Sequence, residues 1–175
     1  MKNLLLVLLV VLLGQQTVLA QKPVKIWVVR HAEKQTNDPK DKDPELSELG
    51  AERATDLMKY LKGDRIDSIY TTNYKRTKLT AFPLADIIGI SMKTYEPAQQ
   101  KELAKQLLEN AKGKKILIVG HSNTVLDVVE AFGAEKPVKE LTDDDYDYIF
   151  AITVKGDKAE VKAERFGKEH RSKEQ

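Results

Sequence analysis

The chain has 175 residues, no cysteine and a formal charge of +2, and these values exclude several classes of protein. The length suits one domain with a hydrophobic core of ordinary size, and without cysteine no disulfide can hold the fold together. The near-neutral charge argues against general binding to nucleic acid, which requires a marked basic excess.

The N-terminal segment has the pattern of a secretory signal peptide. A basic start, Met1-Lys2-Asn3, precedes an apolar run from Leu4 to Leu13, and a small residue, Ala20, follows a polar stretch. A membrane anchor is the alternative, but a spanning helix needs about 20 apolar residues and this run is shorter. We therefore expect residues 1–20 to be removed and the mature protein to be exported, to the periplasm or the medium, with no membrane partner.

The first half of the remaining chain alternates between strand and helix patterns. A β-branched and aromatic run ends abruptly at Arg30-His31, and a polar loop with several turn residues follows it. Apolar residues then recur at helical spacing until Gly63. The patterns predict, in order, a strand at 24–29, a loop at 34–45, a helix at 47–62, a strand at 66–71 and a helix at 77–88 that Pro83 bends or delays.

The second half continues the alternation and ends differently. The run Lys115 to Gly120 is almost purely apolar, as in a central parallel strand that is buried on both faces. Gly156-Asp157 lies between two strand patterns and indicates a hairpin. The predicted elements are a short strand at 92–95, a helix at 97–111, a strand at 115–120, a helix at 124–132 and hairpin strands at 148–154 and 159–166.

This alternation predicts an α/β fold. We expect a three-layer sandwich with a mainly parallel central sheet, helices on both faces and a C-terminal antiparallel hairpin. With no repeat and no linker, one domain over residues 21–167 is the simplest organisation, followed by a charged tail at 168–175. Nothing in the sequence fixes an oligomeric state.

Histidine and arginine side chains follow three of the predicted strands. Arg30-His31 ends the first strand, Arg76 follows the second, and His121 follows the apolar central strand. Ligands of such sheets bind outside the carboxyl ends of the strands, so these side chains are expected to converge there. Arginine binds phosphate oxygens bidentately and stays protonated, and the cluster therefore predicts a site for a phosphate dianion.

The same residues carry a resemblance to the histidine phosphatase superfamily. Arg30-His31-Ala32-Glu33 resembles its Arg-His-Gly signature, with alanine where glycine is common, and Gly120-His121-Ser122-Asn123-Thr124 resembles its second-histidine motif. The remaining motifs are Leu46-Ser47-Glu48-Leu49-Gly50 with Arg53-Ala54, and Arg76-Thr77 with Thr80-Ala81. The motifs occur in the family's order and cover nearly all of the mature chain.

The resemblance implies a metal-independent phosphatase that uses no cofactor and acts on a small phosphorylated substrate. It makes His31 the nucleophile that forms a phosphohistidine intermediate, and Arg30, Arg76 and His121 the phosphate pocket. Asn37 resembles a further phosphate-contacting residue. A neutral imidazole can attack phosphorus near pH 7, because its unperturbed pKa is about 6.5.

A zinc site formed by His31, Glu33 and His121 is the alternative use of these residues. It is disfavoured because two arginines in the same pocket would repel a dication.

A carboxylic acid should protonate the leaving oxygen of an alkyl phosphate, and the sequence gives three candidates for it. Glu96 ranks first by chain position, Glu33 second because it lies near the nucleophile, and Asp127 third. We expect the acidic run at 143–145 to be a solvated turn.

Three functions are compatible with these residues. The leading hypothesis is a phosphomonoester hydrolase. The alternatives are a protein phosphohistidine phosphatase, for which an acid matters less because imidazole leaves more readily than an alkoxide, and a phosphate-binding domain without turnover. A phosphoglycerate mutase is disfavoured by the expected export and by the short segment between Arg76 and His121.

Overall fold

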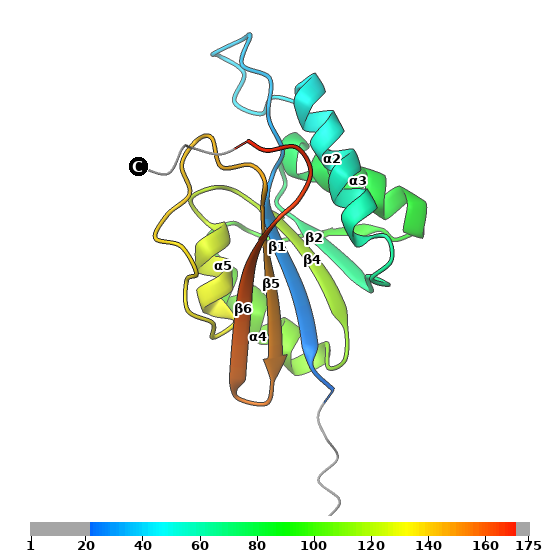
Figure 1. Cartoon of the computed structure of the whole chain (residues 1–175), viewed down its shortest axis with the longest axis vertical. Coiled ribbons are helices and arrows are strands. Elements are labelled where there is room, and N and C mark those ends of the chain that lie inside the picture. Colours follow the sequence, from blue (N-terminus) through cyan, green and yellow to red (C-terminus); the bar gives the residue numbers. More distant parts are fainter. Residues whose placement is uncertain (1–21, 171–175) are drawn as a thin grey trace, which may run out of the picture.

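The computed structural model of the chain describes residues 22–170 (Figure 1). The expected signal peptide at 1–20 and the last five residues of the expected tail lie outside the described part. The elements are β1 (Val24–Arg30), α2 (Glu48–Leu61), β2 (Ser68–Thr71), α3 (Lys75–Ile88), β3 (Met92–Thr94), α4 (Gln100–Asn110), β4 (Lys115–Gly120), α5 (Val125–Ala131), β5 (Tyr148–Lys155) and β6 (Lys158–Arg165).

A six-stranded sheet forms the centre of the molecule, in the order β3-β2-β4-β1-β5-β6. β1 and β4 pair in parallel with Arg30 opposite Gly120, so both strands end at the same edge of the sheet. β2 pairs in parallel with β4, whereas β5 and β6 are antiparallel. The predicted mixed sheet with a C-terminal hairpin is therefore confirmed.

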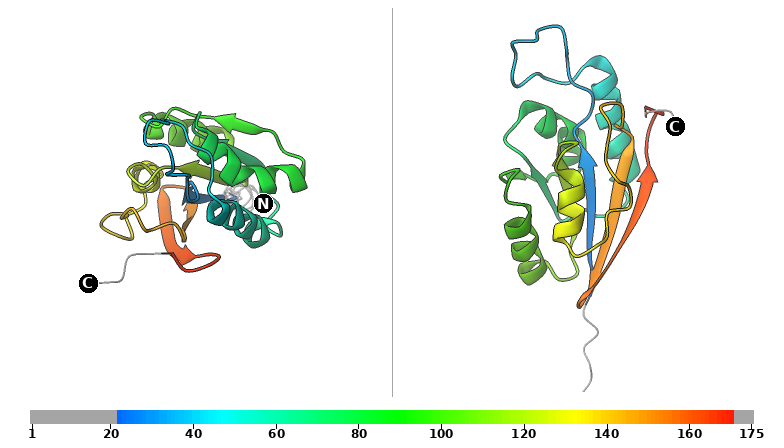
Figure 2. Two further views of the ribbon diagram at one scale, coloured as in Figure 1. Left: turned by 90° about the horizontal axis from the view of Figure 1, so that it is seen from above. Right: turned by 90° about the vertical axis from the view of Figure 1, so that its left-hand side faces the viewer.

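Alternate residues of the central strands pack into two separate cores. Ile26 and Val28 of β1 face the core under α4 and α5, while Trp27 and Val29 face the core under α2 and α3. Figures 1 and 2 show these helix pairs on opposite faces of the sheet. The two faces of β1 and β4 are both covered, which is why these runs contain almost no polar residue.

Several element boundaries differ from the predicted ones. α3 starts at Lys75 and continues through Pro83, because buried residues on both sides of Pro83, such as Ala81 and Leu84, hold the two parts against the core. α4 starts at Gln100, three residues later than predicted, because residues 97–98 form a turn and Gln99 precedes the helix. β2 is two residues shorter at its start than the predicted strand.

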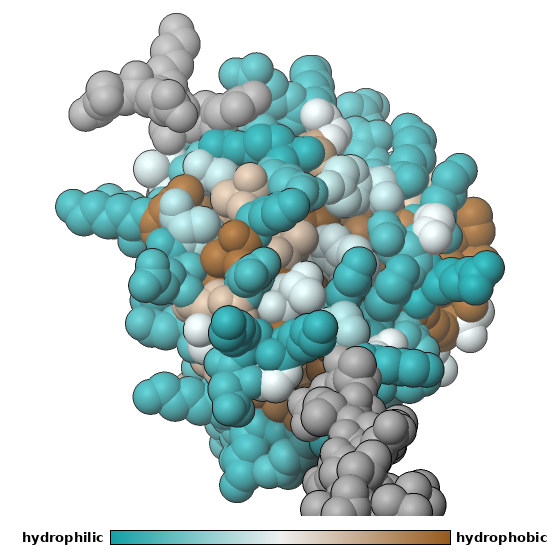
Figure 3. All heavy atoms as spheres, turned by 60° about the horizontal axis from the view of Figure 1, so that its bottom comes forward, coloured by the Kyte–Doolittle hydropathy of each residue, from teal (hydrophilic) through white to brown (hydrophobic). Residues whose placement is uncertain are grey.

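The side of the molecule opposite the carboxyl ends of β1 and β4 is mainly hydrophilic. Figure 3 shows this side, where teal side chains surround a few separate apolar patches. Within residues 22–170, the helices are too short or too polar for any of them to span a bilayer.

Gly50 is the point at which α2 contacts the loop that follows β1. A Cβ placed on Gly50 would lie 2.1 Å from the carbonyl oxygen of Glu33. Ser47 caps the helix by accepting the N–H of Gly50, and its own N–H donates to that same carbonyl. The close approach fixes the loop two residues after His31.

We expect Gly50→Ala to destabilise the fold by about 3 kcal/mol, because main-chain atoms must move to accept the methyl group. Gly63→Ala is the matched control, since a Cβ there meets nothing within 4 Å. Urea denaturation of both variants measures the difference, and equal stabilities would contradict the contact.

Candidate active site

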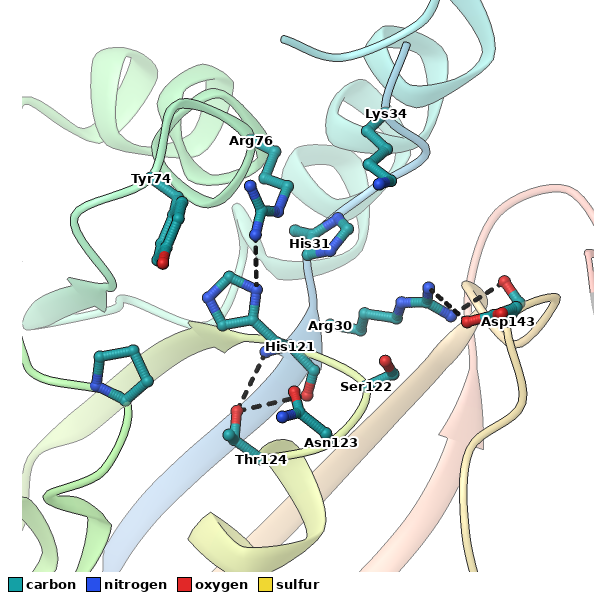
Figure 4. A pocket seen from close by; sticks show the side chains of 11 residues that line it. Arg30, His31, Lys34, Tyr74, Arg76, His121, Ser122, Asn123, Thr124 and Asp143 are labelled. Atoms are coloured by element: carbon teal, nitrogen blue, oxygen red, sulfur yellow. Dashed lines mark hydrogen bonds and ion pairs between the residues drawn. The ribbon is translucent and has the colours of Figure 1, made fainter. Parts of the chain in front are cut away.

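The histidines that follow β1 and β4 lie next to one another in the lining of a pocket of about 370 Å³ (Figure 4). The ring centroids of His31 and His121 are 5.4 Å apart, with 65° between the ring planes. The residues that line the pocket are Arg30, His31, Lys34, Tyr74, Arg76, Pro97, His121, Ser122, Asn123, Thr124 and Asp143. The predicted convergence of Arg30, His31, Arg76 and His121 is thus present.

A main-chain contact fixes the tautomer of His31. Its Nδ1 lies 2.7 Å from the carbonyl oxygen of Ala32, which can only accept, so Nδ1 carries the proton. The main-chain N–H of His31 donates to the carbonyl of Gly120 and continues the sheet. The lone pair of neutral His31 is therefore on Nε2.

The surroundings of both histidines favour the neutral form of the imidazole. Burial, together with the charges of Arg30 and Arg76, lowers the pKa of His31 from 6.5 to about 3, despite the Ala32 hydrogen bond, which acts in the opposite direction. Burial and the same arginines lower the pKa of His121 to about 4. A neutral imidazole has a free lone pair, which a nucleophile requires.

A chain of hydroxyl groups orients His121. Its Nδ1 faces Arg76 Nη2 at 3.5 Å, and because a guanidinium can only donate, Nδ1 accepts. The proton of neutral His121 is then on Nε2, which donates to Thr72 Oγ1 at 2.9 Å. Thr72 can donate in turn to Thr77 Oγ1, whose own hydroxyl donates to main-chain carbonyls. Nδ1 is left facing the pocket.

The guanidinium of Arg30 is anchored at one edge by the loop before β5. Its Nη1 donates to the carbonyls of Thr142 and Asp143, at 2.9 and 3.0 Å, and its plane lies over the ring of Tyr146. The expectation of a fully solvated turn at 143–145 is therefore wrong for Asp145. This residue is only 5% exposed, because its carboxylate accepts from the main-chain N–H and the hydroxyl of Thr142 and so closes the loop around Arg30.

Arg76 is placed by the start of α3. Asp43 lies 3.5 Å from its Nη1, and the ring of Tyr74 packs on its guanidinium. Tyr74 also contacts the edge of His121, so it forms an aromatic wall beside both groups.

Both arginines leave a buried donor unsatisfied. Within the described residues, the Nε–H groups of Arg30 and Arg76 have no hydrogen-bond acceptor. A buried donor without a partner is costly, so a ligand with several acceptor oxygens is the natural occupant of this pocket. A phosphate dianion supplies both the charge and the oxygens.

The three carboxyl groups predicted as proton donors lie elsewhere. Glu96 is exposed and lines a separate hollow beside α4, although its neighbour Pro97 reaches the pocket. Glu33 is buried and bound by the guanidinium of Arg53, with its oxygens 2.8 and 3.0 Å from Nε. Asp127 is exposed on α5 and pairs with Lys136.

Asn37 is also outside the pocket, as an exposed residue of the loop at 34–45. The alternative zinc site would need the carboxylate of Glu33 as a ligand, but this carboxylate forms an ion pair with Arg53. Over the described residues, no group of three or more histidine, aspartate or glutamate side chains is placed to hold a metal ion.

Sequence reasoning missed several residues that shape the pocket. The fold packs the ring of Tyr74 on Arg76 and the ring of Tyr146 on Arg30. It also brings the hydroxyl of Thr72 to Nε2 of His121. Lys34 lines the pocket three residues after His31, and its proximity in sequence was the one available signal.

The low pKa values of His31 and His121 predict their behaviour in a titration. The chain has three histidines, and the imidazole C–H signals of these two should not shift between pH 8 and pH 5 in the free protein. Each pKa is lower in the folded than in the unfolded chain, so protonation favours unfolding. Their contribution to stability is complete above pH 6.5 and is lost as the pH falls towards 4. An NMR titration, with signals assigned from single histidine variants, measures the two pKa values. A titration midpoint near 6.5 for His31 would contradict the prediction.

Sequence comparison finds matches to part of the chain. The profile of the histidine phosphatase superfamily (branch 1) matches residues 26–100. Phosphoserine phosphatase 1 of Hydrogenobacter thermophilus is 41% identical over 68 residues, which are 36% of this chain and 32% of that protein. The matched part therefore spans about a third of the length of this relative.

Solved structures show the same fold at low sequence identity. A mycobacterial glucosyl-3-phosphoglycerate phosphatase superposes with a TM-score of 0.66 at 12% identity, over 82% of this chain and 98% of that one. YhfR of Bacillus stearothermophilus gives 0.66 at 18%, over 81% and 96%. The protein histidine phosphatase SixA, in complex with tungstate, gives 0.62 at 17%, over 81% and 95%.

Proposed function

We propose that the chain is a member of the histidine phosphatase superfamily, whose profile matches residues 26–100, and that it is a phosphatase in which His31 accepts the phosphoryl group. One observation carries this proposal. The unprotonated Nε2 of His31 and the two unsatisfied arginine Nε–H groups belong to residues that line one pocket. A nucleophile and the donors for a dianion are thereby brought together.

The reaction follows from these positions. The lone pair of His31 Nε2 attacks phosphorus, the bond between phosphorus and the leaving group breaks, and Arg30 and Arg76 stabilise the charge on the equatorial oxygens. A bound dianion offsets the repulsion from the arginines and favours protonation of His121, whose Nδ1–H then becomes a further donor. Water finally attacks phosphorus, releases inorganic phosphate and regenerates His31.

A second candidate is hydrolysis of a phosphorus–nitrogen bond, as in a phosphohistidine side chain. It is favoured because Glu96, Glu33 and Asp127 all lie outside the pocket. An alkoxide leaving group needs a proton donor, whereas an imidazole leaving group depends less on one. The structural similarity to the protein histidine phosphatase SixA is consistent with it.

A substrate panel tests both candidates. The full mature chain is assayed with alkyl phosphates, aryl phosphates and phosphohistidine, each with and without a strong chelator. We expect turnover of at least one class, unchanged by the chelator, because the pocket lining is cationic. Turnover that requires added metal, or no turnover of any class, would contradict the proposal.

A further inference from the structure

The chain that follows β6 turns back towards the pocket. Phe166 is buried in the core under α2 and α3, and its N–H donates to the carbonyl of Asp147. Gly167 has a φ of +67°, and a Cβ there would lie 2.9 Å from a carboxylate oxygen of Asp56. This left-handed turn redirects the chain, and Figure 1 shows the segment in red near the upper end of β1.

His170 joins this segment to two loops of the site. Its Nδ1 lies 2.7 Å from Oε1 of Glu33, two residues after the nucleophile. Its ring stacks on that of Tyr146, with centroids 5.1 Å apart and 26° between planes. Its carbonyl accepts the main-chain N–H of Tyr146. Three contacts thus fix one residue of the segment that the sequence predicts as a tail.

Tyr146 in turn touches the phosphate site. The guanidinium carbon of Arg30 lies 3.8 Å from the centroid of the Tyr146 ring, in a cation–π contact, and the ring of His31 lies 6.2 Å away. The carbonyls that anchor Arg30 belong to the same loop as Tyr146. The direction of the free Nε–H of Arg30 therefore depends on where this loop sits.

We propose that residues 167–170 are a positioning element of the phosphate site, in which His170 holds Tyr146 and thereby sets the orientation of Arg30. The proposal rests on the phosphatase function argued above. His170 itself is a positioning residue, because its contacts are to Tyr146 and Glu33 rather than to the pocket.

The fold has little need of these contacts. Glu33 is already satisfied by the guanidinium of Arg53, and after Phe166 residues 167–169 are exposed and His170 is only half-buried. Loss of His170 should therefore change the site more than the stability of the domain.

Two shortened chains and two point variants test the proposal. One chain ends at Gly167, its matched control ends at His170, and His170→Ala is paired with Lys168→Ala, an exposed position in the same segment. The readouts are the dissociation constant for inorganic phosphate, KM and kcat for an aryl phosphate, and the melting temperature. The shorter chain and His170→Ala should bind phosphate about tenfold more weakly, as expected for loss of a positioned charge contact. The two controls should bind as the full chain does.

A double-mutant cycle separates positioning from a general loss of structure. In the background of Tyr146→Leu, His170→Ala should cause no further loss of phosphate affinity, because its effect passes through Tyr146. Equal affinities of the two shortened chains, or additive losses in the cycle, would overturn the proposal. If the full chain itself neither bound phosphate nor turned over a phosphate ester, the phosphatase function would fail instead.

Discussion

His31→Ala is expected to lower turnover by at least about 10⁴-fold, because the reaction loses its nucleophile. The carbonyl of Ala32 fixes the proton on Nδ1, so Nε2 is the attacking atom. His121 cannot take over this role: its Nδ1 faces a guanidinium and its Nε2 donates to Thr72. The measurement is kcat under substrate saturation.

The folded state and the phosphate affinity of His31→Ala provide the control. Arg30 and Arg76 remain in this variant, so it should still bind inorganic phosphate within a few-fold of the wild type. A variant that kept more than a few per cent of the wild-type rate would show that another group is the nucleophile.

Arg76→Ala is expected to lower kcat/KM by about 10² to 10³-fold, with Arg30→Ala similar, since each contributes a charged donor to the phosphoryl oxygens. Arg76→Lys should recover little of the loss, because lysine lacks the planar pair of donors. The exposed Arg65 lies outside the pocket lining, and Arg65→Ala is the matched control. Full activity of Arg76→Ala would contradict the role of this residue.

The strand ends could be predicted because local patterns determine them. Apolar, β-branched runs stop at His31 and His121, and parallel pairing brings the ends of β1 and β4 to one edge of the sheet. The helix over Glu48–Leu61 begins at the capping residue Ser47, as its pattern indicates. These are consequences of neighbouring residues and of one topological rule.

The contacts that orient the site could not be predicted in the same way. Arg30 is anchored by carbonyls of the loop before β5, more than a hundred residues later in the sequence. Main-chain carbonyls have no sequence signature, so the acidic run at 143–145 indicated only a turn. Glu96 was ranked first as the acid by chain position, which does not determine the direction of a side chain. Its side chain lines a hollow outside the pocket, although its neighbour Pro97 is part of the pocket lining.

The buried ion pair between Glu33 and Arg53 could not be predicted from the sequence for a related reason. Glu33 lies two residues after the nucleophile and carries a carboxyl group, as a catalytic acid would. Both of its oxygens, however, accept hydrogen bonds from the guanidinium of Arg53. A carboxylate in that environment is retained as an ion pair, because breaking a buried pair leaves an uncompensated charge. Sequence proximity to His31 placed Glu33 next to the site but carried no information on its ion pair with Arg53.

Trapping the phosphoryl group during turnover tests the central claim most directly. The wild-type protein is mixed with a ³²P-labelled phosphate ester, quenched rapidly, digested and mapped by mass spectrometry. A label on Nε2 of His31 that is labile to acid, stable to base and absent from His31→Ala is the predicted result. Label on His121 or Ser122, or turnover through direct attack of water with no labelled protein at any time, would contradict it.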